Sequence, residues 1–437
     1  MSKGARLSIL ISVCIITAGC TGFYFQSSHR SEKVAVSVYK TPEESDIYVR
    51  FLMEAFDSIQ KNYWQKASDT DLANLFTLAA QKASQASTTP IATDRASTAS
   101  MLARVFGNAT ADARKQLAIN ILMVTLYNLA PAGRNGLLSN EQEKQLRQEV
   151  SNVNPEKDLY ADVGTKAGAT ADEVKTAYTE KKQVLEKATT TEAKKQLADA
   201  NYAYHVLADQ DTKGRYDVAK VEPTIYTHII GETLYLYIEK MSPTTLDEFV
   251  AAIQKVAERK NITSMILDVR GNLGGSLDIA PYFIGMFMGQ NQYTFDLFHQ
   301  GDYIVERSPI AKLDTLKRFH DIAVLTDGMS QSTSEVIAAA LKRLNLAHTV
   351  GSATRGWGTV ENTYPITTSI NASTTYAMLL VQSITLRDDN QPIEGRGVEP
   401  DVNTADANWK DELNTFFRSE SLIAALKDEA KKPPLKE

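Results

Sequence analysis

Cysteine is almost absent from this chain, which has only Cys14 and Cys20 among its 437 residues. Both lie in one apolar run near the start, so the rest of the sequence offers neither a disulfide nor a thiolate nucleophile. The six histidines show no pair at ligand spacing such as His-x-x-x-His, which excludes a Cys/His metal site. No cofactor motif is present, and a net charge of −6 provides no basic field for nucleic acid.

The longest uncharged stretch is residues 7–25, LSILISVCIITAGCTGFYF, which follows Lys3 and Arg6. This length can cross a bilayer as a helix, and the basic flank favours a cytoplasmic N-terminus. We therefore expect residues 1–26 to be a single-pass anchor in the cytoplasmic membrane, with the bulk of the chain extracytoplasmic. Lipoprotein processing at Cys20 is an alternative because T-A-G-C partly matches a lipoprotein cleavage site, and a plain cleaved signal is a third.

The next part of the chain changes from polar to helical in pattern. Residues 27–44 are polar and predict a linker off the membrane. Residues 45–150 predict an all-α region, because apolar residues recur at three- and four-residue spacing in 48–56. Residues 88–100, rich in Thr, Ser and Ala, predict a loop.

From residue 223 onward, strand patterns alternate with helix patterns, which predicts an α/β domain with a mixed sheet over 223–405. The expected strands are 233–238, 265–269, 322–325 and 349–350, and the expected helices are 245–259, 279–288 and 334–344. Residues 406–437 predict a C-terminal helix and a tail. The tail, 427–437, is charged and is expected to be solvated.

The stretch VLTDGMSQSTSEVIAAAL at 324–341 predicts a strand, a tight turn and a helix, with Ser332 at the helix N-terminus. Unpaired N–H groups and the helix dipole can stabilise an oxyanion there. The run S-Q-S-T-S-E at 330–335 resembles the S-A-S-A-S-E run of the C-terminal processing peptidases, also called tail-specific proteases. The resemblance implies that Ser332 is the nucleophile.

Two further segments resemble the same family. Residues 268–275, D-V-R-G-N-L-G-G, are similar to its D-L-R-G-N-P-G-G turn, and residues 395–401, G-R-G-V-E-P-D, are similar to its closing G-x-G-I-x-P-D segment. The resemblance spans residues 224–402. It implies an oxyanion hole formed by Gly274 or Gly275 together with Thr333, and a polypeptide substrate with an exposed C-terminus or an unfolded segment.

The general base of that family is missing. Its T-F-G-K-G-x-V-Q segment corresponds here to T-R-G-W-G-T-V-E at 354–361, so Trp357 takes the lysine position and Glu361 the position of the glutamine that orients it. Two hypotheses stay open. Either Glu361 or another group such as His348 serves as base in a serine-type peptidase, or the chain is a pseudoprotease whose groove holds peptides, with Trp357 as packing or as an apolar platform.

Residues 155–219 resemble a second family, the J domain of DnaJ. The matches are D-L-Y-A-D-V-G at 158–164, N-Y-A-Y-H-V-L-A-D at 201–209 and R-Y-D at 215–217. The His-Pro-Asp tripeptide that stimulates DnaK-type chaperones is absent, since 186–188 reads E-K-A. We therefore expect a spacer or protein-contact unit, without a DnaK-type partner, in the place where processing peptidases carry a PDZ domain.

Overall fold

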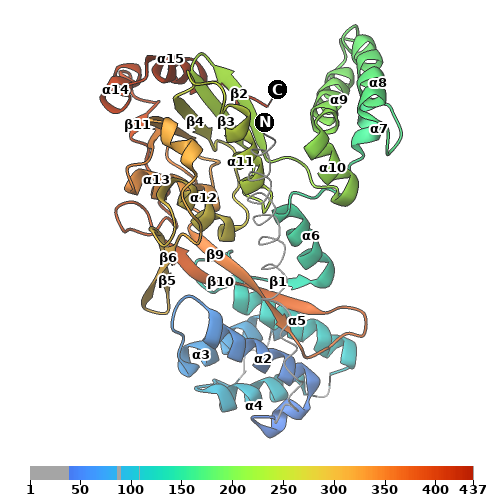
Figure 1. Ribbon diagram of the computed structural model, residues 1–437. Helices are drawn as coiled ribbons and strands as arrows, with labels where there is room; N and C mark the ends of the chain where they lie inside the picture. Colours follow the sequence, from blue (N-terminus) through green and yellow to red (C-terminus); the bar gives the residue numbers. More distant parts are fainter. Residues whose placement is uncertain (1–38, 86–89, 108, 437) are drawn as a thin grey trace, which may run out of the picture.

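The computed structural model describes residues 39–85, 90–107 and 109–436, and Figure 1 shows two helical parts flanking an α/β part. The predicted membrane segment at 7–25 lies outside the described residues. Among the residues that are described, no helix has the length and apolar character needed to cross a bilayer. The N-terminal part consists of η1 (Pro42–Ser45), α2 (Ile47–Asn62), α3 (Asp69–Ser84), α4 (Arg95–Phe106), α5 (Ala111–Tyr127) and α6 (Asn140–Val150).

The helix α4 corrects the predicted loop at 88–100, because it begins at Arg95. Its start is fixed by a capping box in which Asp94 accepts a hydrogen bond from the Ser97 backbone N–H at 2.8 Å. Thr98 and Ala99, which resemble loop residues by composition, are small enough to pack flat in the core and are fully buried. The loop prediction was wrong because it used composition alone, whereas the N-cap and the packing of small residues determine this helix.

Replacing Asp94 with Ala is expected to lower the free energy of unfolding by about 1 kcal/mol, because the first turn of α4 loses its cap. Urea unfolding followed by circular dichroism measures the change. Asp172→Ala is the matched control, since Asp172 is exposed in the first turn of α8 (Ala171–Leu185) and caps nothing. Equal effects of the two variants would show that the Asp94 cap contributes nothing specific.

One strand breaks the expected all-α character of residues 45–150. Strand β1 (Gly136–Ser139) pairs antiparallel with β10 (Tyr376–Thr385), whose sheet also contains β9 (Thr359–Ile366), β5 (Tyr293–His299) and β6 (Asp302–Arg307). Met378 and Leu380 of β10 are buried in the same core as the N-terminal helices. The N-terminal helices and the β9–β10 hairpin thus form one packed body (Figure 1).

The second sheet has the order β11-β8-β7-β4-β3-β2 and is parallel except for the β2–β3 pair. This confirms the mixed sheet predicted from the sequence. Its strands are β2 (Ile225–Ile230), β3 (Thr233–Ile238), β4 (Ser264–Asp268), β7 (Asp321–Thr326), β8 (His348–Gly351) and β11 (Val402–Asn403). The predicted helix at 245–259 is shorter than expected and ends at Lys255.

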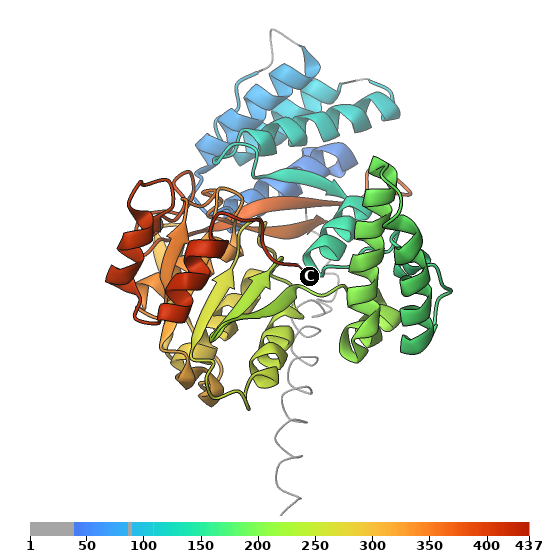
Figure 2. The ribbon, with the colours of Figure 1, turned by 90° about the horizontal axis from the view of Figure 1, so that it is seen from above.

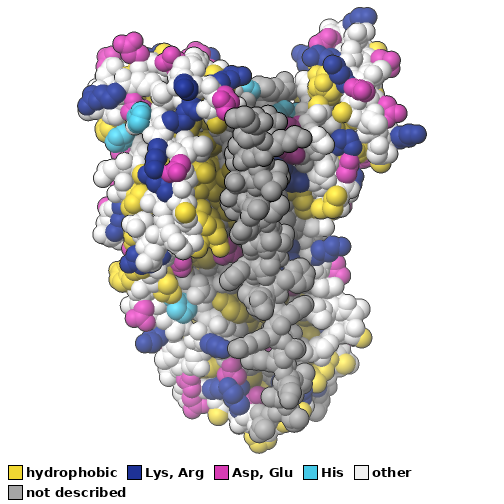
Figure 3. All heavy atoms as spheres, in the orientation of Figure 1, with side chains coloured by type: hydrophobic (Ala, Val, Ile, Leu, Met, Phe, Trp, Pro, Cys, Tyr) yellow, Lys and Arg dark blue, Asp and Glu magenta, His cyan; other side chains and the backbone are white. Residues whose placement is uncertain are grey.

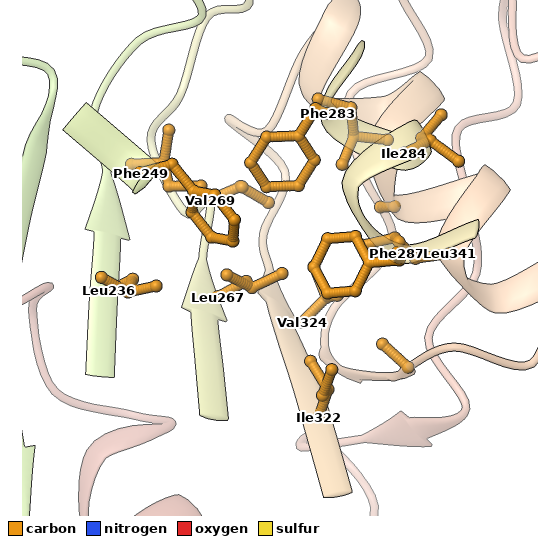
Figure 4. Packing of buried hydrophobic residues seen from close by; sticks show 14 of the residues in the cluster. Leu236, Phe249, Leu267, Val269, Phe283, Ile284, Phe287, Ile322, Val324 and Leu341 are labelled. Carbon is orange, nitrogen blue, oxygen red and sulfur yellow. The ribbon is translucent and has the colours of Figure 1, made fainter. Parts of the chain in front are cut away.

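Both faces of this sheet are covered. One face packs against α11 (Thr245–Lys255), α12 (Ala280–Met288) and α13 (Thr333–Arg343), with the short helices η2 (Leu277–Ile279) and η3 (Asp314–Arg318) nearby. Figure 4 shows Phe249, Phe283 and Phe287 over Leu267, and the rings of Phe249 and Phe283 lie 4.7 Å apart. Burial of each such side chain stabilises the fold by about 1.5 to 3 kcal/mol. The other face packs against α14 (Trp409–Phe416) and α15 (Glu420–Glu429).

Helices α7 (Leu159–Val163), α8 (Ala171–Leu185), α9 (Thr191–Ala208) and α10 (Gln210–Ala219) form a unit beside the α/β body in both ribbon views (Figures 1 and 2). The unit has its own core around Tyr160, Val206 and Tyr216. It contacts the α/β body through an ion pair of 3.3 Å between Lys255 and Asp209. The likeness to a J domain remains a prediction.

The C-terminal tail is not simply solvated, which corrects the expectation for residues 427–437. Helix α15 continues to Glu429, and the Arg270 guanidinium donates to the backbone carbonyls of Ala430 at 2.9 Å and Lys432 at 2.6 Å. The Leu435 N–H donates to the Tyr235 hydroxyl at 3.1 Å. The charged side chains of the tail suggested solvent exposure, but its backbone is hydrogen-bonded to the sheet.

Charges of both signs are spread over the described surface shown in Figure 3, and no large patch of one sign stands out there. This distribution agrees with the modest net charge of −6. It does not single out a ligand-binding face, so the candidate site is built from the motifs and the geometry around them.

Candidate active site

Ser332 sits at the turn between strand β7 and helix α13, as the sequence predicts. It is the N-cap residue of α13, and its φ of +58° is unusual for a residue that is not glycine. Such a conformation costs about 1 to 3 kcal/mol and persists where surrounding contacts impose it. Here the Ser330 hydroxyl donates to the Val269 carbonyl at 2.8 Å, and the Gln331 N–H donates to the Asn272 carbonyl at 2.8 Å. The strained turn is thus tied to the glycine-rich turn at 270–275.

The two glycines of that turn are required by close approach. A Cβ on Gly274, whose φ is +87°, would lie 2.6 Å from the Cβ of Ser332. A Cβ on Gly275, whose φ is +143°, would lie 2.0 Å from the Met241 carbonyl oxygen. No larger residue fits at either position without moving the backbone.

The two glycines differ in what their N–H groups do. The Gly274 N–H donates to the Asn272 side-chain oxygen at 2.7 Å, so it is occupied. In the described part of the chain, neither the Gly275 N–H nor the Thr333 N–H has a protein acceptor. The Gly275 carbonyl accepts the Thr333 hydroxyl at 3.2 Å, which places these two residues against each other. Gly275 and Thr333 are therefore the pair left open for an oxyanion.

Trp357 occupies the place predicted for the lysine, 25 residues after Ser332, and lines the same cleft. Its indole N–H donates to Glu361 Oε1 at 3.0 Å. The guanidinium of Arg134 lies over the ring, 3.3 Å from the ring centre. The indole is thus held on its edge by an acid and on its face by a cation.

Glu361 is half-buried and directed toward Trp357. Its Oε1 also accepts the Thr359 hydroxyl at 2.5 Å. Burial raises the pKa of Glu361, while these hydrogen bonds and the Arg134 charge oppose the rise. Among the described residues, no hydrogen bond joins Glu361 or any other side chain to the Ser332 hydroxyl. The structure therefore shows a serine without a partnered base.

Glu335, the last residue of the S-Q-S-T-S-E run, connects the serine turn to the tryptophan loop. It is fully buried and accepts the N–H groups of Ser332 at 2.8 Å, Gly356 at 2.7 Å and Trp357 at 2.8 Å, as well as the Thr354 hydroxyl at 2.5 Å. Burial raises the pKa of Glu335, and the four donors counter that rise. This carboxylate fixes residue 357 relative to Ser332.

Glu394 and Glu335 together hold the loop at 354–358, and we call this pair of carboxylates the clamp. Its Oε2 accepts the Gly358 N–H at 2.9 Å, and its Oε1 forms an ion pair with Arg134 at 3.0 Å. A Cβ on Gly358 would lie 2.2 Å from the Glu394 nitrogen, so only glycine fits there. Three successive N–H groups, from 356 to 358, are therefore held by two carboxylates.

A cleft of about 740 Å³ runs along this site between helices α12 and α13 and the sheet that contains β9 and β10. It is lined by Ser332, Thr333, Gly275, Trp357 and Glu361, and by side chains of α12, β5, β6, β9 and β10. Strand β9 pairs only with β10 among the described strands, so its other edge is free. Residues 359–362 of β9 line the same cleft as Ser332.

The other base candidates lie elsewhere. The His348 ring packs against Phe416, 5.1 Å between ring centres, and its Nδ1 lies 3.6 Å from Asp401. The ammonium group of Lys342, on α13, donates to the Glu399 carbonyl at 2.9 Å. Neither residue lines the cleft with Ser332. Sequence reasoning missed Arg134 and Glu394, because neither residue lies in one of the recognised active-site motifs.

Within the described residues, no group of His, Cys, Asp and Glu side chains is arranged to hold a metal ion. The groups gathered around Ser332 are a hydroxyl, two open backbone N–H groups, an indole and a carboxylate. This set suits the binding of a polypeptide carbonyl and, with a base, acyl transfer.

Residues 232–404 match the family model described as peptidase family S41. The "Carboxy-terminal processing protease CtpB" of Bacillus subtilis (strain 168) is 27% identical over 181 residues, which are 41% of this chain and 35% of that protein. A "Probable CtpA-like serine protease" of Staphylococcus aureus (strain N315) is 30% identical over 186 residues, which are 43% of this chain and 36% of that protein. The match thus spans little more than a third of each of these two relatives.

Among solved structures, a lipoprotein from Streptococcus agalactiae is 13% identical and superposes with a TM-score of 0.47. The superposition covers 87% of this chain and 99% of that one. The α/β part of this chain is thus similar to peptidase family S41 and to carboxy-terminal processing proteases.

Proposed function

We propose that this chain is an S41-type protein that holds C-terminal or unfolded polypeptide segments in its cleft without cutting them. The observation that carries the proposal is Trp357, which fills the lysine position and is held there by Arg134 and Glu361. Ser332 keeps its place at the start of α13, but no described side chain is hydrogen-bonded to its hydroxyl. Loss of a general base removes about 10² to 10⁴ in rate.

The free edge of β9 supports an extended polypeptide as the ligand. An extended segment can pair with an open strand edge through main-chain hydrogen bonds, which are independent of ligand sequence. Because residues 359–362 line the cleft, a segment paired with β9 would pass Ser332. The open N–H groups of Gly275 and Thr333 would then donate hydrogen bonds to a carbonyl or terminal carboxylate oxygen of the ligand.

The remaining parts of the chain have supporting roles in this proposal. Residues 7–25, outside the described residues, anchor the protein to the cytoplasmic membrane, with lipoprotein attachment at Cys20 as the alternative. The helical unit at 155–219 is a spacer or contact surface for other proteins, and a DnaK-type chaperone is not its partner. Because residues 7–25 are the proposed anchor, the protein used for binding assays should begin at Ser27.

Replacing Asn362 with Trp is expected to weaken binding of an unfolded polypeptide by at least about tenfold, because the exposed side chain of Asn362 lines the cleft and an indole would obstruct it. Fluorescence anisotropy of a labelled, reduced and carboxymethylated α-lactalbumin measures the affinity. Asn414→Trp, an equivalent change on the exposed face of α14, is the control. Equal affinities of the two variants would place the ligand outside the cleft.

The second hypothesis is an active peptidase with Glu361 as base, and one observation favours it. Glu361 lines the same cleft as Ser332, and burial raises its pKa toward the range in which a carboxylate accepts a proton well. Only the deprotonated carboxylate can act as base, so hydrolysis would rise with pH through that raised pKa. It would vanish in Glu361→Gln. A pH profile of peptide cleavage by both proteins distinguishes this hypothesis from the binding proposal.

A further inference from the structure

The residue over the Trp357 indole comes from the N-terminal helical region, far away in sequence. Arg134 lies in the connection between α5 and β1, and this connection is anchored on both sides. The Ala130 carbonyl accepts the Trp64 indole N–H at 2.8 Å, and the Asn135 side-chain oxygen accepts the Val381 N–H at 2.8 Å. Arg134 thus lies between two points at which this connection is attached to other parts of the fold.

The Arg134 guanidinium is bound on two sides. It lies 3.3 Å from the centre of the Trp357 ring, and its Nε and Nη2 donate to Glu394 Oε1 at 3.2 and 3.0 Å. The side chains of Arg134 and Glu394 are each only 17% exposed, so water screens this ion pair weakly. A planar guanidinium can stack on an indole and pair with a carboxylate at once, which a lysine ammonium cannot do equally well.

The same contacts restrain the loop that carries the indole. Glu394 binds Arg134 through one oxygen and the N–H of Gly358, the residue after Trp357, through the other. Glu361 binds the indole edge. Without the guanidinium, Glu394 would lose its ion-pair partner, Glu361 would lose a nearby positive charge, and the ring would lose the contact on its face.

We propose that Arg134 is a positioning residue of the cleft, which holds the Trp357 indole in the lysine position. The N-terminal helical region is then a necessary part of the ligand site, because it contributes this residue. The effect on ligand affinity rests on the proposed function, whereas the effect on the indole does not.

The emission of Trp357 tests the positioning directly. Arg134→Met removes the charge at similar length, and Arg134→Lys keeps the charge without the planar stack. Each is made in the wild-type chain and in a Trp357→Phe chain, which retains Trp64 and Trp409 as background emitters. Arg147→Met on α6 is the control, because the Arg147 side chain is 71% exposed.

We expect Arg134→Met to increase acrylamide quenching of the Trp357 emission, obtained by difference, at least about twofold, with an intermediate value for Arg134→Lys. Quenching of the Trp357→Phe chain should not change. Affinity for carboxymethylated α-lactalbumin should fall about 3- to 30-fold in Arg134→Met, the range expected from a cation–π contact. It should not fall further when Trp357→Phe is combined with it.

Unchanged quenching in Arg134→Met, or an equal change in both backgrounds, would overturn the assignment. Thermal unfolding of each variant identifies a general loss of structure, and Arg134→Lys provides the second measurement if Arg134→Met unfolds. A wild-type chain that binds no unfolded polypeptide overturns the proposed function, and the emission comparison alone then decides the role of Arg134.

Discussion

Replacing Trp357 with Lys and Glu361 with Gln is expected to raise hydrolysis of an unfolded polypeptide about 10²- to 10⁴-fold over the wild-type chain, the usual contribution of a general base. The backbone of residue 357 is already fixed relative to Ser332 by Glu335, which accepts the N–H groups of both residues. A lysine placed there would extend into the cleft that Ser332 lines. The open N–H groups of Gly275 and Thr333 would stabilise the oxyanion.

Arg134 should help the introduced lysine. Its guanidinium lies over the position of residue 357, and a nearby like charge lowers the pKa of an ammonium group. A lysine with a lowered pKa is deprotonated more often near neutral pH and accepts the serine proton better. Glu361→Gln removes a carboxylate that would otherwise hold the lysine in its charged form.

Cleavage is measured by mass spectrometry of carboxymethylated α-lactalbumin over time. Addition of Ser332→Ala to the double variant should abolish the gain, and Trp357→Met with Glu361→Gln should show none, since methionine offers length without a base. If the double variant gains nothing while remaining folded, the oxyanion geometry inferred for Gly275 and Thr333 is wrong.

Replacing Glu335 with Ala is expected to lower the free energy of unfolding by about 3 to 5 kcal/mol, the loss typical when one partner of a buried charged network is removed. Four donors, three of them backbone N–H groups, would lose their acceptor in a fully buried place. Each unsatisfied donor costs about 1 to 3 kcal/mol, less what relaxation recovers.

Urea unfolding measures this loss, with Glu258→Ala as the control because Glu258 is exposed. Glu335→Gln should lose nearly as much as Glu335→Ala, since the amide NH₂ group would face N–H donors. A loss below about 1 kcal/mol in Glu335→Ala would mean that the loop at 354–358 rearranges freely, and the clamp described above would not exist.

Much of the α/β part could be predicted from the sequence because its signals are local. Apolar runs such as 265–269 and 322–325 mark buried parallel strands, and the structure confirms them as β4 and β7. The motif spacing predicted that residue 357 returns to the serine, and the structure places Trp357 and Ser332 in one cleft. A fixed spacing carries this information because α13, β8 and their flanking turns lie between the two residues.

The parts that could not be predicted depend on contacts between distant segments. Arg134 reaches the Trp357 ring because β1, a strand of four residues with no alternating pattern, pairs with β10. The choice between Gly274 and Gly275 depends on the Asn272 side chain, which occupies one N–H and leaves the other open. Arg270 binds the tail through backbone carbonyls. Because every residue has a backbone carbonyl, residue types cannot predict such contacts.

The most direct test of the account follows binding and cleavage in one sample. The wild-type chain from Ser27 onward is incubated with carboxymethylated α-lactalbumin and, in parallel, with a serine-reactive fluorophosphonate, with Ser332→Ala as the control. The proposal of binding without cleavage predicts a stable complex with intact polypeptide and no labelling above the control. Cleavage and labelling that disappear in Ser332→Ala would contradict it and would show a serine peptidase with a base other than lysine.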